Sequence, residues 1–442
     1  MTTVAVLGAG ALGLAGARRL AQGGARVTVY EREAEPGGLA AGVRIGPSWL
    51  EKFYHHIFGT DRRVIGLIEE LGLGPDLIWG RPPTAMLRDG GVHRLDGPIE
   101  VLKFGPLSPL ARVRLGLGVA LLKAIPDPER LEGTTAARWL PRWMGREAYE
   151  TIWKPQLAGK FGAEAGQIGM PWMWARIHDR TPKLGYLRGG FQRLYAALAD
   201  DVARRGGTLR FGSAVESIAR TMDGVRVGTA DGTQTYDAVL CTLPTRLFLR
   251  AAEGLPEEYA ASYARTGEHL SAHCVVLELD RQLQSAYWVS VLDPGYPFLA
   301  LVEHTNWLPP ADYGGRHLVY LGNYLPPNDP LFALDEAALL DKMTPHLARL
   351  NPRFDRSWIK AVHAFAAPYA QPIVRIGYRE TLAPHRTPLP GVWLANMGHV
   401  YPHDRGQNYS ALLGEEIAEQ ILAEVGTVSG TAARRLDLAP SA

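Results

Sequence analysis

Residues 4–38 read VAVLGAGALGLAGARRLAQGGARVTVYEREAEPGG, and this stretch decides the fold. The apolar run at 4–7 predicts a short parallel strand that is buried on both faces. Residues 8–13, GAGALG, match the G-x-G-x-x-G fingerprint, residues 14–22 predict a helix, and residues 26–30 predict a second strand. This order of strand, glycine turn, helix and strand predicts an α/β protein with a Rossmann-like dinucleotide-binding domain.

Each glycine of the fingerprint has a physical role. Gly8 permits the tight turn, Gly10 lets the backbone approach a pyrophosphate, and Gly13 permits close packing of the helix on the strand. The helix begins near Ala11 and Leu12, where free amides and the positive end of the helix dipole attract a diphosphate. We therefore expect all five residues to bind the cofactor.

The residues after the second strand indicate which dinucleotide is bound. Glu31 ends that strand, and its carboxylate can accept both hydroxyls of an adenosine ribose. The neighbouring Arg32 can favour a 2′-phosphate, but Glu31 favours an unphosphorylated ribose. Gly37 and Gly38, followed by Leu39, let the chain run close along the pyrophosphate and ribityl side of an extended cofactor. This second glycine pair predicts FAD rather than NAD.

Composition limits the remaining alternatives. A chain of 442 residues is too long for one compact core, which predicts two domains. A formal charge of +2 without a basic run argues against nucleic acid as a partner and favours a small-molecule substrate. The two cysteines, Cys241 and Cys274, are too few for a disulfide framework or a four-thiolate metal site. No targeting segment is evident, so a cytoplasmic location is expected; the oligomeric state stays open.

Residues 107–125 are rich in Leu, Val and Ala, but Arg112, Arg114 and Lys123 interrupt them, so they do not predict a membrane span. Two interpretations stay open. The segment is either a half-buried helix of the second domain or a helix that lies in a membrane surface. Peripheral contact with a membrane therefore remains an alternative to a purely cytoplasmic protein.

Periodicity along the rest of the chain predicts that two domains share it. The expected helices are 191–205, 335–350 and 409–424, and the expected strands are 208–211, 215–227 with a turn at Asp223-Gly224, 236–242, 269–280, 317–324 and 392–395. We assign 1–80, 187–246 and 375–426 to the FAD-binding domain. We assign 81–186 and 247–374 to an interleaved α+β substrate domain, and 427–442 to a tail.

The sequence resembles a known superfamily. GAGALG at 8–13 together with ERE-x-x-PGGLA at 31–40 is similar to the FAD-dependent amine oxidases, protoporphyrinogen oxidases, phytoene desaturases and UDP-galactopyranose mutases. The PGGLA segment is closer to the oxidase and desaturase branch. SAVESI at 213–218 resembles the strand whose valine contacts adenine, which implies that Val215 does so here.

The resemblance also implies a C-terminal segment that faces the flavin ring. Here this segment is ANMG at 395–398 and DRGQNY at 404–409, and the implied cofactor contacts are Asn396, Met397, Gln407, Asn408 and Tyr409. The superfamily usually places an acid near the ribityl chain. This sequence has Asn396 and Met397 there, which is a departure from the pattern.

Candidates for the chemistry begin in WLEKFYHHIFGTD at 49–61. The fragment around His56 resembles an HIF-containing stretch of the mutases. We expect Tyr54 to face the flavin, with His55 or His56 as an acid, a base or a polar contact. Packing or a structural hydrogen bond is the alternative for the two histidines. Successive strand side chains point to opposite faces, so the two histidines are not expected to share a metal. Glu51 and Lys52 are expected on a solvated or paired face.

Further candidates lie in the second domain. Arg176 alternates with two tryptophans, so it either recognises an anionic group with its guanidinium or forms an interdomain ion pair. Tyr369 is expected to line the substrate cavity. Lys160, in KFG at 160–162, loosely resembles a K-x-W region of the mutases, and His403, Asp404 and Arg405 crowd a loop before the last helix.

These observations favour an FAD-dependent oxidoreductase that removes a hydride from a C–H bond, oxidising C–N, C–O or C–C in a small or lipophilic organic substrate. The alternative is a redox-neutral sugar-nucleotide mutase in which reduced flavin acts as a nucleophile. Such a mutase needs paired arginine and tyrosine side chains in the second domain, and no pair is evident from the sequence. A flavin-binding sensor or scaffold is a third, non-enzymatic alternative.

Overall fold

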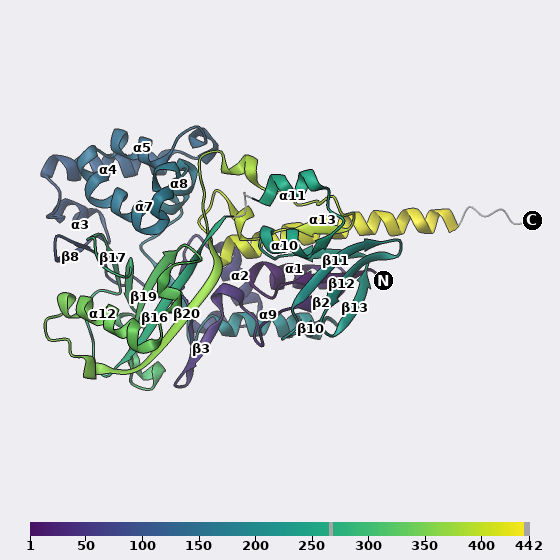
Figure 1. Ribbon diagram of the computed structural model, residues 1–442, viewed down its shortest axis with the longest axis horizontal. Helices are drawn as coiled ribbons and strands as arrows, with labels where there is room; N and C mark the ends of the chain where they lie inside the picture. Colours follow the sequence, from purple (N-terminus) through teal and green to yellow (C-terminus); the bar gives the residue numbers. More distant parts are fainter. Residues whose placement is uncertain (265–267, 437–442) are drawn as a thin grey trace, which may run out of the picture.

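The computed structural model describes residues 1–264 and 268–436, and its centre is a sheet of five parallel strands (Figure 1). Across the sheet the order is β10 (Thr208–Arg210), β2 (Arg26–Tyr30), β1 (Thr3–Leu7), β14 (Ala238–Cys241) and β21 (Val392–Leu394). Every neighbouring pair is parallel. The first strand lies in the middle, which confirms the Rossmann-like α/β fold.

Three helices pack together beside this sheet: α1 (Ala11–Gln22), α9 (Gln192–Arg204) and α13 (Gln407–Leu436). Helices α1 and α13 touch backbone to backbone, because a Cβ added at Gly16 would lie 2.9 Å from the carbonyl oxygen of Gly414. Helix α13 continues beyond the end at 424 that the sequence pattern predicted. The expected tail is thus helical to Leu436, and residues 437–442 lie outside the described part of the chain.

The described residues also form a mixed sheet of seven strands. Its order is β20 (Ile359–Pro372), β16 (His269–Leu279), β19 (His317–Leu325), β18 (Ala300–Glu303), β17 (Trp288–Val291), β7 (Thr84–Arg88) and β8 (Gly91–Arg94). Only β17 and β7 pair in parallel within this described sheet. Helix α12 (Glu336–Leu350) packs Leu339, Met343 and Leu347 onto it. The strands expected near 269–280 and 317–324 are confirmed.

A helical layer covers one end of this sheet (Figure 1). It consists of α3 (Pro98–Lys103), α4 (Pro109–Ala124), α5 (Ala136–Trp143), α6 (Arg146–Ala148), α7 (Lys154–Phe161) and α8 (Met170–His178). Helix α4 buries Ala111, Leu115, Gly118 and Leu122 and exposes most of its other side chains, as a half-buried helix should. Most tryptophans of this layer fill its core, since Trp139, Trp172 and Trp174 are all buried.

Smaller elements connect the two large sheets. They are the sheet β13 (Gly232–Tyr236), β12 (Gly224–Thr229), β11 (Val215–Thr221) and β15 (Ala252–Glu253); the hairpin β3 (Gly42–Ile45) and β4 (Ser48–Glu51); the sheet β5 (Ile57–Phe58), β9 (Leu184–Leu187) and β6 (Leu77–Gly80); and helices α2 (Arg62–Glu70), α10 (Thr245–Ala251) and α11 (Glu257–Ala264). The turn between β11 and β12 lies at residues 222–223, next to the expected position.

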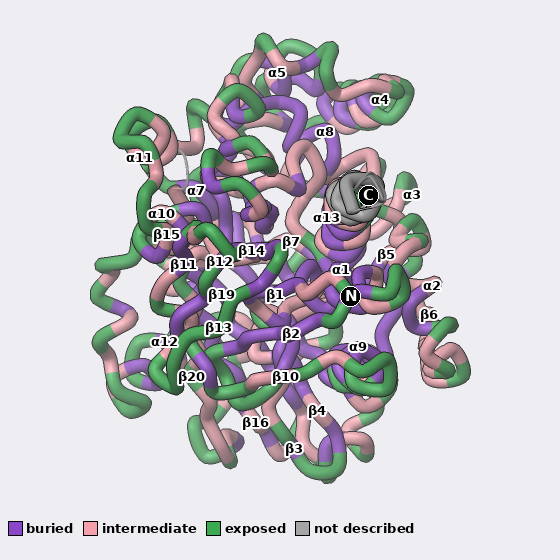
Figure 2. The backbone as a smooth tube through the Cα atoms, turned by 90° about the vertical axis from the view of Figure 1, so that its right-hand side faces the viewer, coloured by how far each residue is buried: buried purple, intermediate pink, exposed green. Residues whose placement is uncertain are grey.

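The backbone of the central strands is the most deeply buried part of the molecule (Figure 2). Strand β1 buries Val4, Ala5, Val6 and Leu7 completely, because helices or strands cover both of its faces. Among residues 1–264 and 268–436, no helix combines the length and the hydrophobicity that crossing a bilayer requires.

Glu51 was expected on a solvated or paired face, and it is buried and hydrogen-bonded instead of solvated. Its side chain has no exposed surface, and its carboxylate accepts hydrogen bonds from the Phe191 backbone N–H (2.6 Å) and the Tyr186 hydroxyl (2.8 Å). The Tyr320 hydroxyl donates to the Glu51 carbonyl oxygen (2.8 Å). Glu51 thus ties β4 to the start of α9 and to β9, while β19 of the large mixed sheet holds the Glu51 backbone. Strand alternation alone did not reveal this, because the partners come from distant segments.

Glu51 gives a prediction for the pH dependence of stability. Burial raises the pKa of Glu51 from 4.5 to about 7. The hydrogen bonds from Phe191 and Tyr186 lower the pKa, but burial has the larger effect. The folded protein therefore holds a proton between those values that the unfolded chain has released, so stability falls as pH rises through this window. Between these two pH values the free energy of unfolding of wild type should fall by on the order of 3 kcal/mol because of Glu51. Glu51→Gln has no proton to lose there, so urea denaturation at a series of pH values should show that this part of the fall is absent from the variant. Parallel pH profiles for the variant and wild type would contradict this assignment.

Candidate active site

A long groove of about 970 Å³ runs along the carboxyl ends of the central strands. The fingerprint residues form its floor: Gly8 has a φ of +111°, and a Cβ at Gly13 would lie 1.9 Å from the Gly8 carbonyl oxygen. A Cβ at Gly38 would lie 3.2 Å from the Gly10 Cα, so the two glycine segments meet without side chains between them. This close approach leaves room for a pyrophosphate above the start of α1.

Glu31 lies at one end of the groove and is almost completely buried. One carboxylate oxygen accepts the Ala9 N–H (2.8 Å), and the other accepts the Glu33 N–H (3.0 Å). These bonds fix the carboxylate, and each oxygen retains a lone pair for a ribose hydroxyl. Arg32 lines the outer edge, where it is exposed and pairs with Glu33 at 3.0 Å.

Most of the predicted cofactor contacts lie along this groove. Ala11, Leu12, Gly37, Leu39, Val215, Asn396, Met397 and Gln407 all line it. Asn396 acts structurally, because its amide donates to the Leu243 carbonyl oxygen (3.0 Å) and accepts from the Gly398 N–H (3.0 Å). Gln407 accepts from the Tyr195 hydroxyl (2.6 Å), and its buried Nε2 has no partner among the described residues. An extended dinucleotide would fit this groove and supply an acceptor for that amide.

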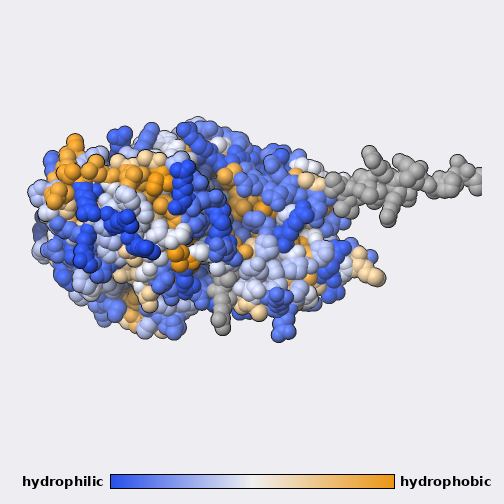
Figure 3. Space-filling model, turned by 90° about the horizontal axis from the view of Figure 1, so that it is seen from above, coloured by the Kyte–Doolittle hydropathy of each residue, from blue (hydrophilic) through white to orange (hydrophobic). Residues whose placement is uncertain are grey.

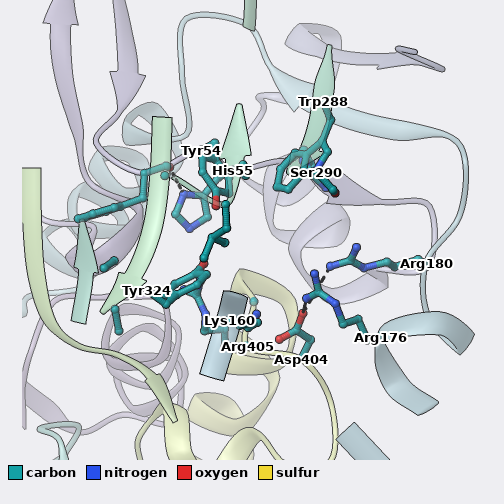
Figure 4. Close-up of a pocket in the computed structure, with 18 of the residues that line it drawn as sticks. Tyr54, His55, Lys160, Arg176, Arg180, Trp288, Ser290, Tyr324, Asp404 and Arg405 are labelled. Atoms are coloured by element: carbon teal, nitrogen blue, oxygen red, sulfur yellow. Dashed lines mark hydrogen bonds and ion pairs between the residues drawn. The ribbon is translucent and has the colours of Figure 1, made fainter. Parts of the chain in front are cut away.

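A second cavity, of about 210 Å³, adjoins the groove. The two share six residues: Leu39, Phe53, His55, Arg405, Gly406 and Gln407. The wall of the second cavity combines strands of the large sheet with α7, α8 and the loop before α13 (Figure 4). Its distinctive polar and aromatic residues are Tyr54, His56, Lys160, Trp172, Arg176, Arg180, Trp288, Ser290, Tyr324 and Asp404. A reactive ring at the junction would therefore face this cavity.

Of the two histidines, His55 lies at the junction. Its Nδ1 lies 2.5 Å from the Phe53 carbonyl oxygen, so Nδ1 carries the proton and Nε2 is left to accept one. His56 packs edge-on against Phe58 and Trp288. Burial lowers the pKa of His55 to about 4 and that of His56 to about 3, so both rings are neutral near pH 7. Among the described residues, no three metal-ligating side chains come together.

Arg176 forms the ion pair that one interpretation predicted, and its recognition of an anionic group stays a prediction. It lines the second cavity, and its Nη1 donates to Asp404 Oδ2 (2.8 Å), which joins α8 to the loop before α13. Asp404 also accepts from Trp172 Nε1 (3.2 Å) and lies 3.5 Å from Arg180. Burial raises the pKa of Asp404, but the charges of Lys160 and the two arginines outweigh it and hold the pKa at about 2.

Two further cations, Lys160 and Arg405, form no ion pair with a carboxylate among the described residues. Lys160 is buried, with Nζ 5.0 Å from the ring centre of Trp172 and 4.9 Å from that of Tyr324. Arg405 donates to Gln371 Oε1 (2.9 Å) and to the Tyr324 hydroxyl. Burial lowers the pKa of Lys160 well below 10.5 and that of Arg405 to about 10. Four basic side chains line the cavity, Lys160, Arg176, Arg180 and Arg405, against three carboxylates, Asp61, Asp179 and Asp404, so basic groups outnumber acidic ones there.

Three predicted residues lie elsewhere than expected. Tyr369, with a φ of +57°, lines the dinucleotide groove and not the second cavity. Asn408 accepts from the Arg63 N–H (2.8 Å) and so caps α2. Tyr409 stacks on His403 and donates to Asp179 (3.1 Å) at the edge of the second cavity. The contacts of these residues with a cofactor or substrate stay predictions.

Comparison with known proteins places this arrangement in a family. A family model described as flavin containing amine oxidoreductase matches residues 13–403. The chain belongs to this family. The match runs from Gly13, near the start of α1, to His403 and covers the large sheet, so the superfamily resemblance is confirmed, and the coarser assignment as a flavin enzyme stands.

Solved structures agree on the fold of this flavin amine oxidoreductase. A protein from Exiguobacterium sp. 255-15 designated a protoporphyrinogen oxidase is 17% identical, with 96% of this chain and 99% of that chain covered at a TM-score of 0.76. A reduced UDP-galactopyranose mutase is 15% identical, with 96% of each chain covered and a TM-score of 0.74. An engineered putrescine oxidase is 16% identical, with 96% of this chain and 99% of that chain covered at a TM-score of 0.71. Oxidases and a mutase thus share this fold.

Proposed function

We propose that the chain binds FAD in the groove and removes a hydride from a C–H bond of an organic anion held in the second cavity. The observation that carries this proposal is a pair of cations in the cavity wall, the buried Lys160 and the half-buried Arg405, neither of which forms an ion pair with a carboxylate of the described residues. A buried charge without a partner is costly, so a surplus of this kind is expected where a ligand supplies the opposite charge.

The fit of FAD rests on residues along the whole groove. Glu31 would accept hydrogen bonds from the adenosine ribose hydroxyls, and the Gly8–Gly13 turn would hold the pyrophosphate. Gln407 Nε2 would donate a hydrogen bond to the flavin end of the cofactor. Bound FAD supplies the hydride acceptor that protein side chains lack.

The side chains of the second cavity have separate tasks in this proposal. Arg405 and Lys160 bind the anionic group of the substrate, and Trp288 with Tyr54 form an apolar wall, their rings 4.9 Å apart. His55 Nε2 accepts a hydrogen bond or a proton from the substrate beside the oxidised carbon. Its neutral state near pH 7 suits that role.

A sugar-nucleotide mutase is the second candidate. The observation that favours it is the contact between Arg405 and the Tyr324 hydroxyl, an arginine–tyrosine pair that the sequence did not reveal. A diphosphate would suit the same cations that an organic carboxylate would.

Anaerobic mixing of the oxidised holoenzyme with candidate compounds tests the proposal. Organic carboxylates and phosphates should bleach the visible flavin absorbance, whereas neutral polyenes and the cationic putrescine should not. If sugar nucleotides turn over only after dithionite reduction and no compound bleaches the flavin, the oxidoreductase proposal is wrong and the mutase is supported. Bleaching by putrescine alone would overturn the assignment of an anionic substrate.

A further inference from the structure

The outer surface of α3, α4 and α5 carries a cluster of exposed apolar side chains, which we call the α3–α5 patch. Its members are Ile99, Leu102, Leu110, Val113, Leu117, Leu121 and Trp143, all between 41% and 80% exposed. Thirteen large hydrophobic side chains are exposed in the described part of the chain, and these seven all come from residues 99–143. Figure 3 shows a hydrophobic band on the end of the molecule that carries these helices.

The pattern of α4 explains the patch. Leu110, Val113, Leu117 and Leu121 recur at helical spacing on the outward face, while Leu115 and Leu122 point into the core. A helix that is apolar on both faces normally has a partner on both. Contiguous exposed apolar surface of this kind usually marks an interaction site.

The patch is held in place before anything binds it. Arg112 donates to the carbonyl oxygens of Leu107 and Leu102 (both 2.8 Å), which fixes the segment between α3 and α4. Ser108 caps α4 and donates from both N–H and hydroxyl to Glu147 (2.6 and 2.7 Å). The apolar side chains therefore form one preformed surface.

Charge and aromatic content indicate what covers the patch. Residues 98–124 contain four basic side chains, Lys103, Arg112, Arg114 and Lys123, and one acidic side chain, Glu100. The Trp143 side chain is half exposed at the edge of the patch, and the backbone of Trp143 lies close to Gly118 of α4. Apolar residues flanked by lysine, arginine and tryptophan are typical of helices that lie at the surface of a bilayer.

We propose that the α3–α5 patch lies on the surface of a bilayer that contains anionic lipids. A second copy of the chain is the competing occupant. A two-fold dimer would bring the same basic side chains of both copies together, which is unfavourable, whereas anionic headgroups would neutralise them. The interaction is peripheral, with the helices parallel to the bilayer plane.

This surface is connected to the second cavity. The carbonyl oxygen of Ile125, just after α4, accepts from Trp174 Nε1 (2.8 Å) in α8. Lys123 Nζ donates to the carbonyl oxygen of Arg180 (3.4 Å), whose side chain lines the cavity. Membrane binding would therefore place the cavity wall near the headgroups, although the proposal stands without the proposed reaction.

Vesicle co-sedimentation of the full-length holoprotein tests the proposal. Wild type should bind phosphatidylcholine vesicles that contain phosphatidylglycerol, more weakly in high salt. Leu110→Glu/Leu117→Glu should reduce binding by about tenfold or more, since it removes two apolar contacts and adds two repelled charges. The matched control is Met222→Glu, an equally apolar exposed site in the β11–β12 turn, which should bind like wild type.

A second variant and a mass measurement keep the proposal falsifiable. Lys103→Glu/Lys123→Glu leaves the apolar side chains intact and should weaken binding to the anionic vesicles by a similar factor. Wild-type protein that stays in the supernatant at low salt, or a double-leucine variant that binds equally well, would overturn the proposal. The mass of the protein in solution gives a further test. The proposal would also fail if wild type is a dimer that does not bind vesicles and Leu110→Glu/Leu117→Glu converts it to a monomer.

Discussion

Gly13→Ala is expected to yield a protein that has lost most of its flavin and about 3 kcal/mol of its free energy of unfolding, at the upper end of the usual cost of overpacking. The added methyl group would lie 1.9 Å from the Gly8 carbonyl oxygen and 3.5 Å from the Val6 side chain. Neither backbone segment can move freely, because Gly8 donates to Tyr30 (2.7 Å) and Leu14 donates to Gly10 (2.9 Å). Helix α1 must shift away from β1, which opens the turn that holds the pyrophosphate.

Gly116→Ala in α4 is the matched control for this substitution. Gly116 is also a helical glycine, but a Cβ there meets no atom within 4 Å. The same change should therefore stabilise the protein by about 0.5–1 kcal/mol, the usual difference between glycine and alanine in a helix. Urea denaturation and the ratio of flavin to protein absorbance measure both effects. Full flavin occupancy in Gly13→Ala would show that the turn tolerates the shift.

The cofactor groove could be predicted from the sequence because its floor is local. Gly8, Gly10 and Gly13 lie on one turn, and Glu31 follows within the same β–α–β unit, so their spacing alone fixes their relation. The role of Asn396 could not be predicted in this way. It depends on the carbonyl oxygen of Leu243, which lies 153 residues earlier in the chain.

The second cavity was only partly predictable, because its residues come from many separate segments. His55 and Arg176 were found as candidates, but nothing in the sequence places Lys160 beside Tyr324, or Asp404 between two arginines. Glu51 was misjudged for a related reason. A carboxylate in a polar-looking stretch resembles a surface residue until its donors, Phe191 and Tyr186, are known. Hydrogen bonds between polar groups that are far apart in the chain leave no periodic pattern in the sequence, so periodicity cannot predict them.

Lys160→Met should separate recognition of the substrate from stability. If Lys160 binds the anion, its loss should lower kcat/KM for an anionic substrate about a hundredfold, through removal of one buried charge partner. The rise in KM should exceed the fall in kcat, because the contact is made in the bound ground state too. Without substrate, the variant should be more stable than wild type by about 1 kcal/mol.

The gain in stability follows from the sign of the pKa shift. Burial lowers the pKa of Lys160, so at neutral pH the folded protein disfavours the proton that the unfolded chain carries. Methionine is unbranched, fills a similar volume and avoids this cost. The ring faces of Trp172 and Tyr324 offset part of that cost in wild type, which keeps the expected gain small.

Lys154→Met in the same helix provides the control. Lys154 is exposed in α7 and pairs with Glu150 at 2.6 Å, so its loss should leave both the stability and the kinetics close to those of wild type. Both variants are compared with wild type in two measurements. One is steady-state kinetics with an anionic compound that bleaches the flavin, and the other is urea denaturation. Lower activity combined with higher stability is expected of a residue that is kept for its ligand. A Lys160→Met protein that is as active as wild type but less stable would instead show that Lys160 serves packing.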